Sequence, residues 1–498
     1  MKLTRRDFLK YSGFTGTAIL GGYMFNQISN PIESGGQFGT VNPDFNADVD
    51  ILFRAHTDTV QILDGPTTTV WRYTGEIILG SDTNLQTVSD SYLGPSIRVR
   101  TGQKVRISFE NNLPEASNIH WHGLYVPDYA DGHPRFVAQA GETYVYEFEV
   151  INRAGTYWYH PHPHQRTGVQ VNAGLAGLFI VEDDTEDSLN IPSGQFDLPL
   201  VIQDRRFDAA NQLIYVSNMH DRMMGFRGNT VLVNGEVNAR WSVATRSYRL
   251  RLLNGSNSRI YILAWNDESP LYVIGTDGGL LERTVTKQYI TLGPAERVEL
   301  WVDFSNHEIG TELQLIDLGA EQAIILGTFS VEQNLDERVD IPTTIREMEY
   351  LDSQQAVNTD HPRNFDFTMG QTSPMINNQT FEMNAVADNE LVRLGDTEIW
   401  EFRNHPQNGM MSMPHPIHMH GRQFQVIERT VLPNYARQWA NIIEGYVDYG
   451  WKDTVLLLPG ETVRVIVKFD HYPGIFVYHC HTLEHEDLGM MRNYEVLA

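Results

Sequence analysis

The strongest constraint on the fold of this chain is an internal repeat that links two distant segments. Residues 141–162 begin with Gly-Glu-Thr and end with Gly-Thr-Tyr-Trp-Tyr-His-Pro-His, and residues 460–481 begin with Gly-Glu-Thr and end with Gly-Ile-Phe-Val-Tyr-His-Cys-His. In both segments the chain advances by 19 residues from the first glycine to the first histidine. A weaker copy, without the histidines, is present at 251–255 and 293–298. The repeat therefore predicts three copies of one module.

The apolar segments indicate that each module is built from β-strands. They are short, rich in Val, Ile, Tyr, Phe and Thr, and separated by Gly, Pro, Asn and Asp, which is typical of stacked β-sandwiches. A chain of 498 residues is long enough for about three domains of ordinary size. We therefore expect an all-β protein.

One motif near the C-terminus contains the only cysteine of the chain, Cys480, so no intrachain disulfide is possible. His479 and His481 flank Cys480, and His485 and Met490 follow. A cysteine, two histidines and a weak axial methionine are the ligands of a blue-copper electron-transfer site. On a strand, His479 and His481 would face one way and Cys480 the other, so the motif could join two metal sites. A buried, metal-free cysteine is the alternative.

Three further histidine clusters make the metal interpretation stronger. One His-x-His pair is weak evidence, because a strand face can carry two imidazoles for packing alone. Here ten of the 18 histidines fall in four clusters. The three additional clusters contain His120 and His122; His160 and His162; and His415, His418 and His420.

Together the four segments resemble the copper motifs of the multicopper oxidases, and the resemblance spans nearly the whole mature chain. It implies a blue copper held by His415, Cys480, His485 and axial Met490. It also implies a trinuclear cluster, with one copper held by His120 and His418. The coupled pair would be held by His122, His160, His162, His420, His479 and His481. His164 has no role in this scheme, and we expect it to be exposed or to support a ligand.

The resemblance also implies the architecture, which is three cupredoxin-like Greek-key β-sandwich domains. We place an export signal and linker at 1–45, domain 1 at 46–190, domain 2 at 191–340 and domain 3 at 341–498. Domains 1 and 3 would supply the ligands of the trinuclear cluster, and domain 3 would also hold the blue copper. Domain 2 has no His-x-His and would be a spacer that lets the outer domains meet.

Reduction of dioxygen to water consumes protons, and copper-bound imidazoles do not donate them readily. Asp131 lies just past the first histidine pair and Glu486 is adjacent to His485. Both match positions where bacterial members of the family carry a proton-relay acid, and a carboxylic acid can act as a general acid. The alternatives are a turn aspartate and a solvated glutamate.

The substrate is less constrained. Phenols and aromatic amines, as for laccases, need an open groove beside His415 or His485, whereas cuprous ion needs soft thioethers there. Methionines cluster at 410–413 and at 219–224, but such residues are often packing. We expect a laccase-like oxidase of phenols and aromatic amines, with cuprous or other metal-ion oxidation in copper tolerance as the alternative. A copper-binding or structural protein of the same fold is the non-enzyme alternative.

The N-terminus indicates export. Arg5-Arg6 precedes Phe-Leu-Lys and a weakly apolar stretch, which resembles a twin-arginine signal and predicts a periplasmic or extracellular protein. No later apolar run is long enough to span a membrane. The formal charge of −26 disfavours nucleic acid as a partner. We expect a monomer.

Overall fold

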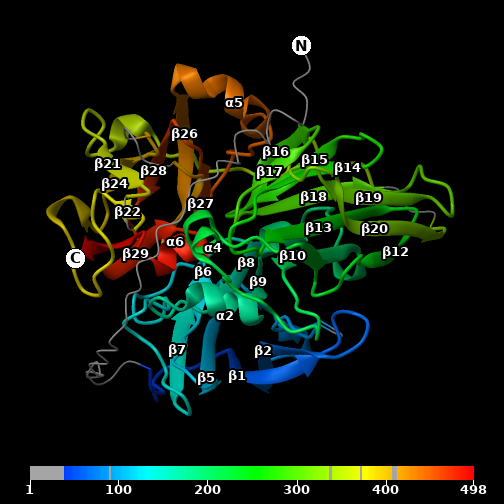
Figure 1. Ribbon diagram of the computed structural model, residues 1–498, viewed down its shortest axis with the longest axis horizontal. Helices are drawn as coiled ribbons and strands as arrows, with labels where there is room; N and C mark the ends of the chain where they lie inside the picture. Colours follow the sequence, from blue (N-terminus) through cyan, green and yellow to red (C-terminus); the bar gives the residue numbers. More distant parts are fainter. Residues whose placement is uncertain (1–38, 89–90, 336–338, 371–372, 407–411) are drawn as a thin grey trace.

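The computed structural model describes residues 39–88, 91–335, 339–370, 373–406 and 412–498. Strands dominate it, so the predicted all-β fold is confirmed. In these residues the strands form six sheets, and each consecutive stretch of chain builds two of them. We call the three stretches the first, middle and last strand groups; they are coloured blue to cyan, green, and yellow to red in Figure 1. The exact domain limits stay a prediction.

The first strand group begins with a strand whose burial alternates residue by residue, as expected where one face packs on a core. Its sheets, in spatial order, are β2 (Thr68–Leu79), β1 (Val49–Val60), β5 (Lys104–Asn112) and β7 (Thr143–Glu149), and then β3 (Leu85–Gln86), β4 (Ser96–Arg100), β9 (Gly177–Glu182), β8 (Gly155–His160) and β6 (His120–His122).

The middle strand group has the same plan. One sheet is β11 (Thr230–Val233), β10 (Asp197–Arg205), β13 (Ser247–Asn254), β18 (Arg297–Asp303), β15 (Leu271–Thr276) and β16 (Gly279–Lys287). The other is β12 (Arg240–Ala244), β20 (Ile324–Gln333), β19 (Glu312–Asp317), β14 (Tyr261–Trp265) and β17 (Ile290–Leu292).

The last strand group repeats the order of the first. One sheet is β22 (Met375–Ile376), β21 (Arg363–Thr368), β24 (Thr397–Arg403), β28 (Glu461–Lys468) and β26 (Phe424–Val431). The other is β23 (Leu391–Arg393), β30 (Met491–Leu497), β29 (Gly474–Cys480), β25 (His415–Met419) and β27 (Thr454–Leu457). In each of the three groups an apolar cluster lies between the two sheets.

The sequence repeat corresponds to one turn that recurs in all three groups. In each copy a glutamate accepts a backbone N–H from the residue three positions earlier through its side chain, which closes the turn before a strand. An asparagine on the neighbouring strand exchanges two backbone hydrogen bonds with the same turn. The glutamates are Glu142, Glu296 and Glu461, and the asparagines are Asn111, Asn254 and Asn404.

The helices are short and connect or cover the sheets. They are α2 (Thr167–Ala173), α3 (Asp184–Asp187), α4 (Met219–Met224), α5 (Pro433–Ile443) and α6 (Leu483–Asp487), with 3-10 turns η1 (Asp82–Asn84), η2 (Gly194–Phe196), η3 (Ser353–Gln355) and η4 (Asp388–Glu390). Among the described residues, no helix is both long and apolar enough to cross a membrane. The predicted export signal lies outside the described residues.

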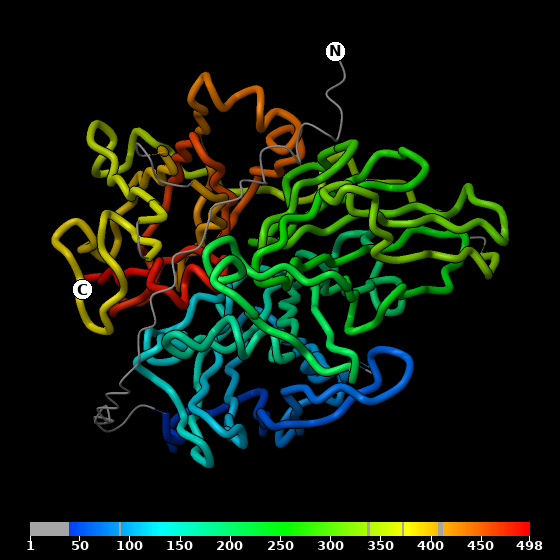
Figure 2. The backbone as a smooth tube through the Cα atoms, in the orientation of Figure 1, coloured from blue at the N-terminus to red at the C-terminus, as the bar shows by residue number. Residues whose placement is uncertain are grey.

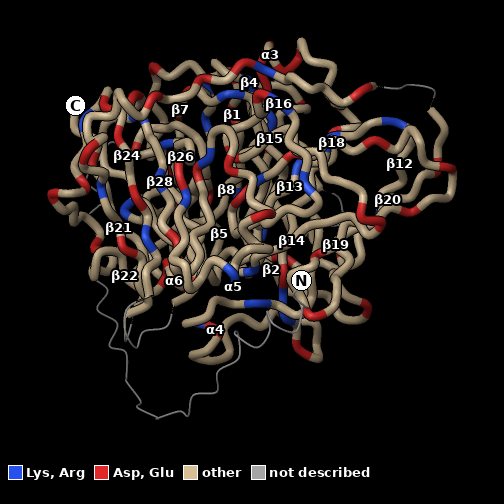
Figure 3. Tube along the Cα trace, turned by 90° about the horizontal axis from the view of Figure 1, so that it is seen from above, with Lys and Arg blue, Asp and Glu red and all other residues tan. Residues whose placement is uncertain are grey.

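The chain folds so that its histidine-bearing segments meet. The tube in Figure 2 shows the cyan and red parts of the chain side by side, and close contacts between the rings of His162 and His479 and of His120 and His418 lie where they meet. Asp and Glu residues are spread along the whole trace in Figure 3 and form no single patch in that view.

Candidate metal centre

Three side chains converge on one side of the end of β29. The Sγ of Cys480 lies 3.3 Å from Nδ1 of His415, on β25, and 3.7 Å from Nδ1 of His485, on α6. All three residues are fully buried. The outer nitrogen of His485, Nε2, donates to the carbonyl of Met223 at 3.0 Å, so its Nδ1 can keep a lone pair toward the sulfur. The arrangement provides the thiolate and imidazoles of a blue-copper site.

Met490 returns beside this group because the chain reverses after α6. The N–H of Cys480 donates to the carbonyl of Met490 at 3.0 Å, and the N–H of Met490 donates to the carbonyl of His485 at 2.9 Å. Met490 is buried in the same apolar cluster as Cys480. Burial raises the pKa of the Cys480 thiol to about 12, so metal binding must displace its proton.

On the other side of Cys480, eight histidines surround one small space. Four lie on or next to β6 and β8 of the first strand group, and four on or next to β25 and β29 of the last. The Nε2–Nε2 distances are 3.2 Å for His120 and His418, 3.3 Å for His162 and His479, 3.1 Å for His420 and His479, and 3.4 Å for His160 and His481. His122 approaches His160 at 3.4 Å through Nδ1 instead.

Four of these rings have Nδ1 facing away from the shared space and Nε2 facing into it, and the contacts of Nδ1 indicate that Nε2 can bind a metal. Nδ1 of His120, His160, His418 and His479 each lies 2.6–3.1 Å from a backbone carbonyl. A carbonyl only accepts, so the hydrogen stays on Nδ1 and a neutral ring points a lone pair inward. Burial lowers the pKa of His160 to about 3 and that of His479 to about 4, so these rings are neutral at pH 7. Facing lone pairs cannot hydrogen-bond, whereas a bound cation satisfies both, and imidazole suits copper.

The two acids predicted from the sequence border this space. Asp131 is fully buried; its Oδ2 accepts from Nδ1 of His420 at 2.7 Å, and its carbonyl accepts from Nδ1 of His120 at 2.6 Å. Its Oδ1 is buried and has no hydrogen-bond partner among the described residues. Burial raises the pKa of this carboxyl well above its usual range. Asp131 therefore contacts both His120 and His420, and its buried carboxyl favours the protonated form.

Glu486, on α6, contacts two other histidines of the group. Its Oε1 is 3.4 Å from Nε2 of His162 and its Oε2 is 3.2 Å from Nδ1 of His479. Burial, followed by the neighbouring Asp487, raises the pKa of Glu486 well above that of a free glutamate. A solvated glutamate and a simple turn aspartate, the two alternatives, do not describe these buried contacts.

Comparison with known proteins decides the family. Two models described as "Multicopper oxidase" match residues 58–186 and 356–498. "Multicopper oxidase mco" of Staphylococcus aureus is 32% identical over 84% of this chain and 86% of that protein. The chain belongs to the multicopper oxidase family. A "Laccase" of Bacillus stratosphericus is also 32% identical, over 83% of this chain and 91% of that protein.

The solved structures agree with this placement. The McoA multicopper oxidase from the hyperthermophile Aquifex aeolicus is similar over 91% of this chain and 97% of that one, with a TM-score of 0.77 and 36% identity. This confirms the predicted fold of three cupredoxin-like Greek-key sandwiches. As a multicopper oxidase, the protein is an oxidoreductase that uses oxygen and four copper ions, and its buried histidine groups are consistent with those sites.

His164 and the methionines at 410–413 were considered in the sequence but are not among the proposed ligands. His164 is exposed and packs on Phe381, with ring centroids 5.2 Å apart. Met410 and Met411 lie outside the described residues, whereas Met413 is buried in the core of the last strand group.

The expectation that the middle strand group is only a spacer is incomplete. Besides the Met223 carbonyl, it supplies Tyr215, Asn257 and the N–H of Phe226, which all donate to Glu484 on α6 at 2.8–2.9 Å. Contacts between such distant segments carry no local sequence pattern, so sequence reasoning missed them.

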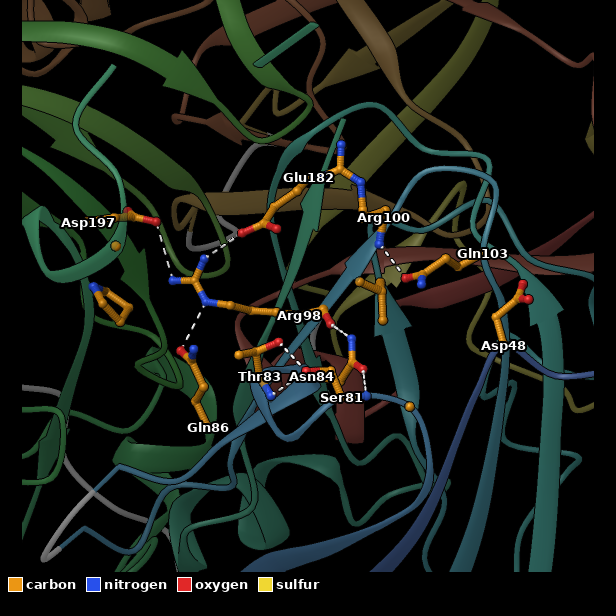
Figure 4. A pocket seen from close by; sticks show the side chains of 14 residues that line it. Asp48, Ser81, Thr83, Asn84, Gln86, Arg98, Arg100, Gln103, Glu182 and Asp197 are labelled. Carbon is orange, nitrogen blue, oxygen red and sulfur yellow. Dashed lines mark hydrogen bonds and ion pairs between the residues drawn. The ribbon is translucent and has the colours of Figure 1, made fainter. Parts of the chain in front are cut away.

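The structure also has a polar cleft that contains none of the proposed ligands among its described lining residues. Its lining residues come mainly from η1, β4 and β10, and its volume is about 500 Å³. Figure 4 shows Arg98 and Arg100 among the side chains that line it. Arg98 already bonds to Gln86, Glu182 and Asp197, and Arg100 bonds to two aspartates. Because both of its arginines are paired and none of the proposed ligands is among its described lining residues, we assign it no role.

Proposed function

We propose that this multicopper oxidase takes electrons singly from phenols and aromatic amines and uses them to reduce dioxygen to water. The observation that carries the proposal is the back-to-back arrangement at the end of β29. Cys480 contacts His415 and His485 on one side, while His479 and His481 join the eight-histidine group on the other. A single peptide segment thus connects the place where electrons enter to the place where oxygen would react.

We assign the ligands by which donors cluster. His415, Cys480 and His485 would form one group, with Met490 as a fourth ligand. His120 and His418 would hold a single copper. His122, His160 and His481 would form one half of the coupled pair, and His162, His420 and His479 the other. In each of these sets the buried donor atoms lie within 4.8 Å of one another, and His122 lies equally close to His120 and His418. When bound, copper supplies one-electron transfer at the first group and oxygen reduction at the others.

The acids complete the proton balance, because reduction of one dioxygen to two waters takes up four protons and four electrons. Asp131 would hold a proton at its unpartnered Oδ1, beside His120 and His420. Glu486 would hold one between His162 and His479. Burial raises the pKa of both carboxyls, which favours the protonated form that a general acid needs.

Cuprous ion is the second candidate substrate, and a specific contact favours it. Helix α4 lies against α6 (Figure 1), and its Met223 carbonyl covers the outer nitrogen of His485. The same helix carries Met219, which is exposed, and Met224, which is half-buried. Thioethers are ligands for Cu(I), so this cover could deliver electrons from cuprous ion.

Oxygen uptake with each reductant separates the two substrates. We expect the copper-loaded protein to be blue, to bleach with a phenol and to recover in air, with one dioxygen consumed per four electrons. Met219→Leu should slow cuprous oxidation and leave phenol oxidation unchanged if cuprous ion is a true substrate. Met348→Leu, in the core cluster of the middle strand group, is a control for the loss of a thioether outside α4. A colourless copper-loaded protein without oxygen uptake would remove the enzyme proposal.

The cellular setting is also proposed. We infer export of the folded, copper-loaded protein by the twin-arginine machinery, from Arg5-Arg6 in the segment outside the described residues. Replacing both arginines by lysine should abolish export, whereas loss of export in a strain lacking only the general secretory route would contradict it. A monomer is expected in size-exclusion chromatography.

A further inference from the structure

Arg297, the first residue of β18, lies where the three strand groups meet. It is 1% exposed. Its Nε donates to the carbonyl of Thr156 in the first group at 2.9 Å, and its Nη atoms donate to carbonyls of Ala295 and Asp277 in the middle group at 3.0 Å. In the last group, Asp453 accepts from Nη1 at 2.7 Å and from Nη2 at 2.5 Å. One guanidinium therefore uses all its nitrogens to join the three groups.

Asp453 in turn contacts two of the histidines proposed as copper ligands. Its Oδ1 accepts from Nε2 of His122 at 3.0 Å, and its backbone carbonyl accepts from Nδ1 of His418 at 2.8 Å. Thr454 reinforces the contact, because its hydroxyl lies 3.2 Å from Nε2 of His122. A single residue thus fixes one histidine from β6 and one from β25.

This contact explains why His122 differs from the other cluster histidines. The contacts of the other seven within the cluster are made through Nε2, whereas His122 faces His160 through Nδ1. A carboxylate can only accept, so Asp453 holds the hydrogen of His122 on Nε2 and leaves the lone pair on Nδ1. If the carboxylate turned away, the hydrogen could move to Nδ1 and remove that donor.

The backbone beside His122 leaves space for the side chains of Arg297 and Asp453. Gly123 has a φ of +87°, and a Cβ there would lie 2.4 Å from Oδ2 of Asp453 and 2.9 Å from Nη2 of Arg297. Only a glycine leaves room for both side chains at this place.

We infer that Arg297 and Asp453 form a positioning pair through which the middle strand group sets the orientation of His122 and His418 in the trinuclear centre. The inference rests on the proposed copper function. Neither residue is a ligand. Arg297 holds both carboxylate oxygens with its planar fork, so that Oδ1 stays on Nε2 of His122.

Replacements of similar size should remove the hydrogen bonds of this pair without creating a cavity. Arg297→Lys keeps the charge but cannot hold both oxygens and the Thr156 carbonyl at once. Asp453→Asn is isosteric, but an amide has a single acceptor oxygen. It must turn its NH₂ group either toward Arg297, donor against donor, or toward His122, which would move the ring hydrogen to Nδ1.

The matched control is Arg251→Lys. Arg251 is equally buried, also belongs to the middle strand group and also reaches Thr156, through the hydroxyl at 3.0 Å. Its other hydrogen bonds go to Asp197, Glu299 and Glu186 rather than to Asp453. It therefore matches the loss of a buried arginine fork across the same junction.

The experiment measures copper per protein, the blue absorption band, the electron paramagnetic resonance of the cluster copper, and the thermal unfolding midpoint. For Arg297→Lys and Asp453→Asn we expect a full blue band, while the affinity for cluster copper falls roughly 10–100-fold. Arg251→Lys should lower the thermal unfolding midpoint about as much as the other two variants do, but it should retain all four coppers. Retention of the blue band shows that each variant has folded.

Two results would overturn the inference. One is cluster occupancy and resonance in both Arg297→Lys and Asp453→Asn that match those of Arg251→Lys. The other is parallel loss of blue and cluster copper in all three variants, which would indicate a purely structural role. Failure of the underlying function is distinguishable, because it would appear as missing cluster copper or missing oxygen uptake in the unaltered protein.

Discussion

Helix α6 is held against the middle strand group by its buried Glu484, and this clamp allows a quantitative prediction. Glu484 is 3% exposed and accepts from Tyr215 at 2.8 Å, from Asn257 at 2.9 Å and from the N–H of Phe226 at 2.9 Å. Asn257 also donates to the carbonyl of Gly168 at 2.9 Å. Because α6 carries His485, loosening the clamp should disturb the blue site without touching a ligand.

The expected costs follow from the hydrogen bonds lost. Tyr215→Phe removes one bond to a carboxylate, and we expect a loss of about 1.5–3 kcal/mol in the free energy of unfolding. Asn257→Ala removes one such bond and one to a neutral carbonyl, so about 2–4.5 kcal/mol is expected. Chemical denaturation of the copper-free protein measures both, and the blue band of the loaded variants shows whether the site is retained.

The effect of Tyr215→Phe should depend on pH. Burial raises the pKa of Glu484 to about 7, while its three donors hold it down. A carboxyl with a raised native pKa binds more protons folded than unfolded, so its ionisation lowers stability as pH rises from about 4.3 toward 7. Losing the Tyr215 donor raises the native pKa further, so the decline continues above pH 7. The cost should be larger at pH 8 than at pH 6. A cost below about 0.5 kcal/mol, or one that is equal at both pH values, would refute the reasoning.

Three further predictions concern the copper centres and the repeat. Asp131→Asn should keep the blue band but slow oxygen uptake roughly 100-fold, as loss of a general acid does, and a rate within about threefold of the unaltered protein would contradict that role. Cys480→Ser should abolish the blue band and electron transfer, as visible absorption and oxygen uptake would show, while metal analysis still finds the cluster copper; survival of the band would exclude Cys480 as its source. Gly141→Ala should cost about 1 kcal/mol in denaturation and leave activity unchanged, because Gly141 has a φ of +83° and open space around its Cα; an unchanged stability would contradict this backbone argument.

The sequence was most informative where function depends on local spacing. Strand alternation around Cys480 predicted that its side chain and those of His479 and His481 would face opposite ways, and the contacts have that arrangement. The repeat was visible because one turn needs the same residues each time it occurs. Even the degenerate middle copy kept its glutamate, Glu296, and Ala295 adopts a φ of +69° where the other two copies have glycine.

The sequence was least informative where function depends on packing between strand groups. Arg297 and Asp453 are 156 residues apart, and each looks like an ordinary charge beside a strand. Nothing local indicates that they meet at a histidine. Gly123 follows His122 directly in the sequence. A glycine is needed there because the side chains of Arg297 and Asp453 approach from the two other strand groups. Such a reason can be read only from the assembled structure.

These contacts give a role to a strand group that supplies none of the proposed ligands of the copper centres. In the proposed mechanism, electrons pass along the segment around Cys480, which requires the blue site and the cluster to keep a fixed relation. The middle group would hold the proposed blue site through Glu484 and the Met223 carbonyl, and the proposed cluster through Arg297 and Asp453. Both anchors act through residues next to ligands, so substitutions in the middle group can alter either centre while the ligand set stays intact.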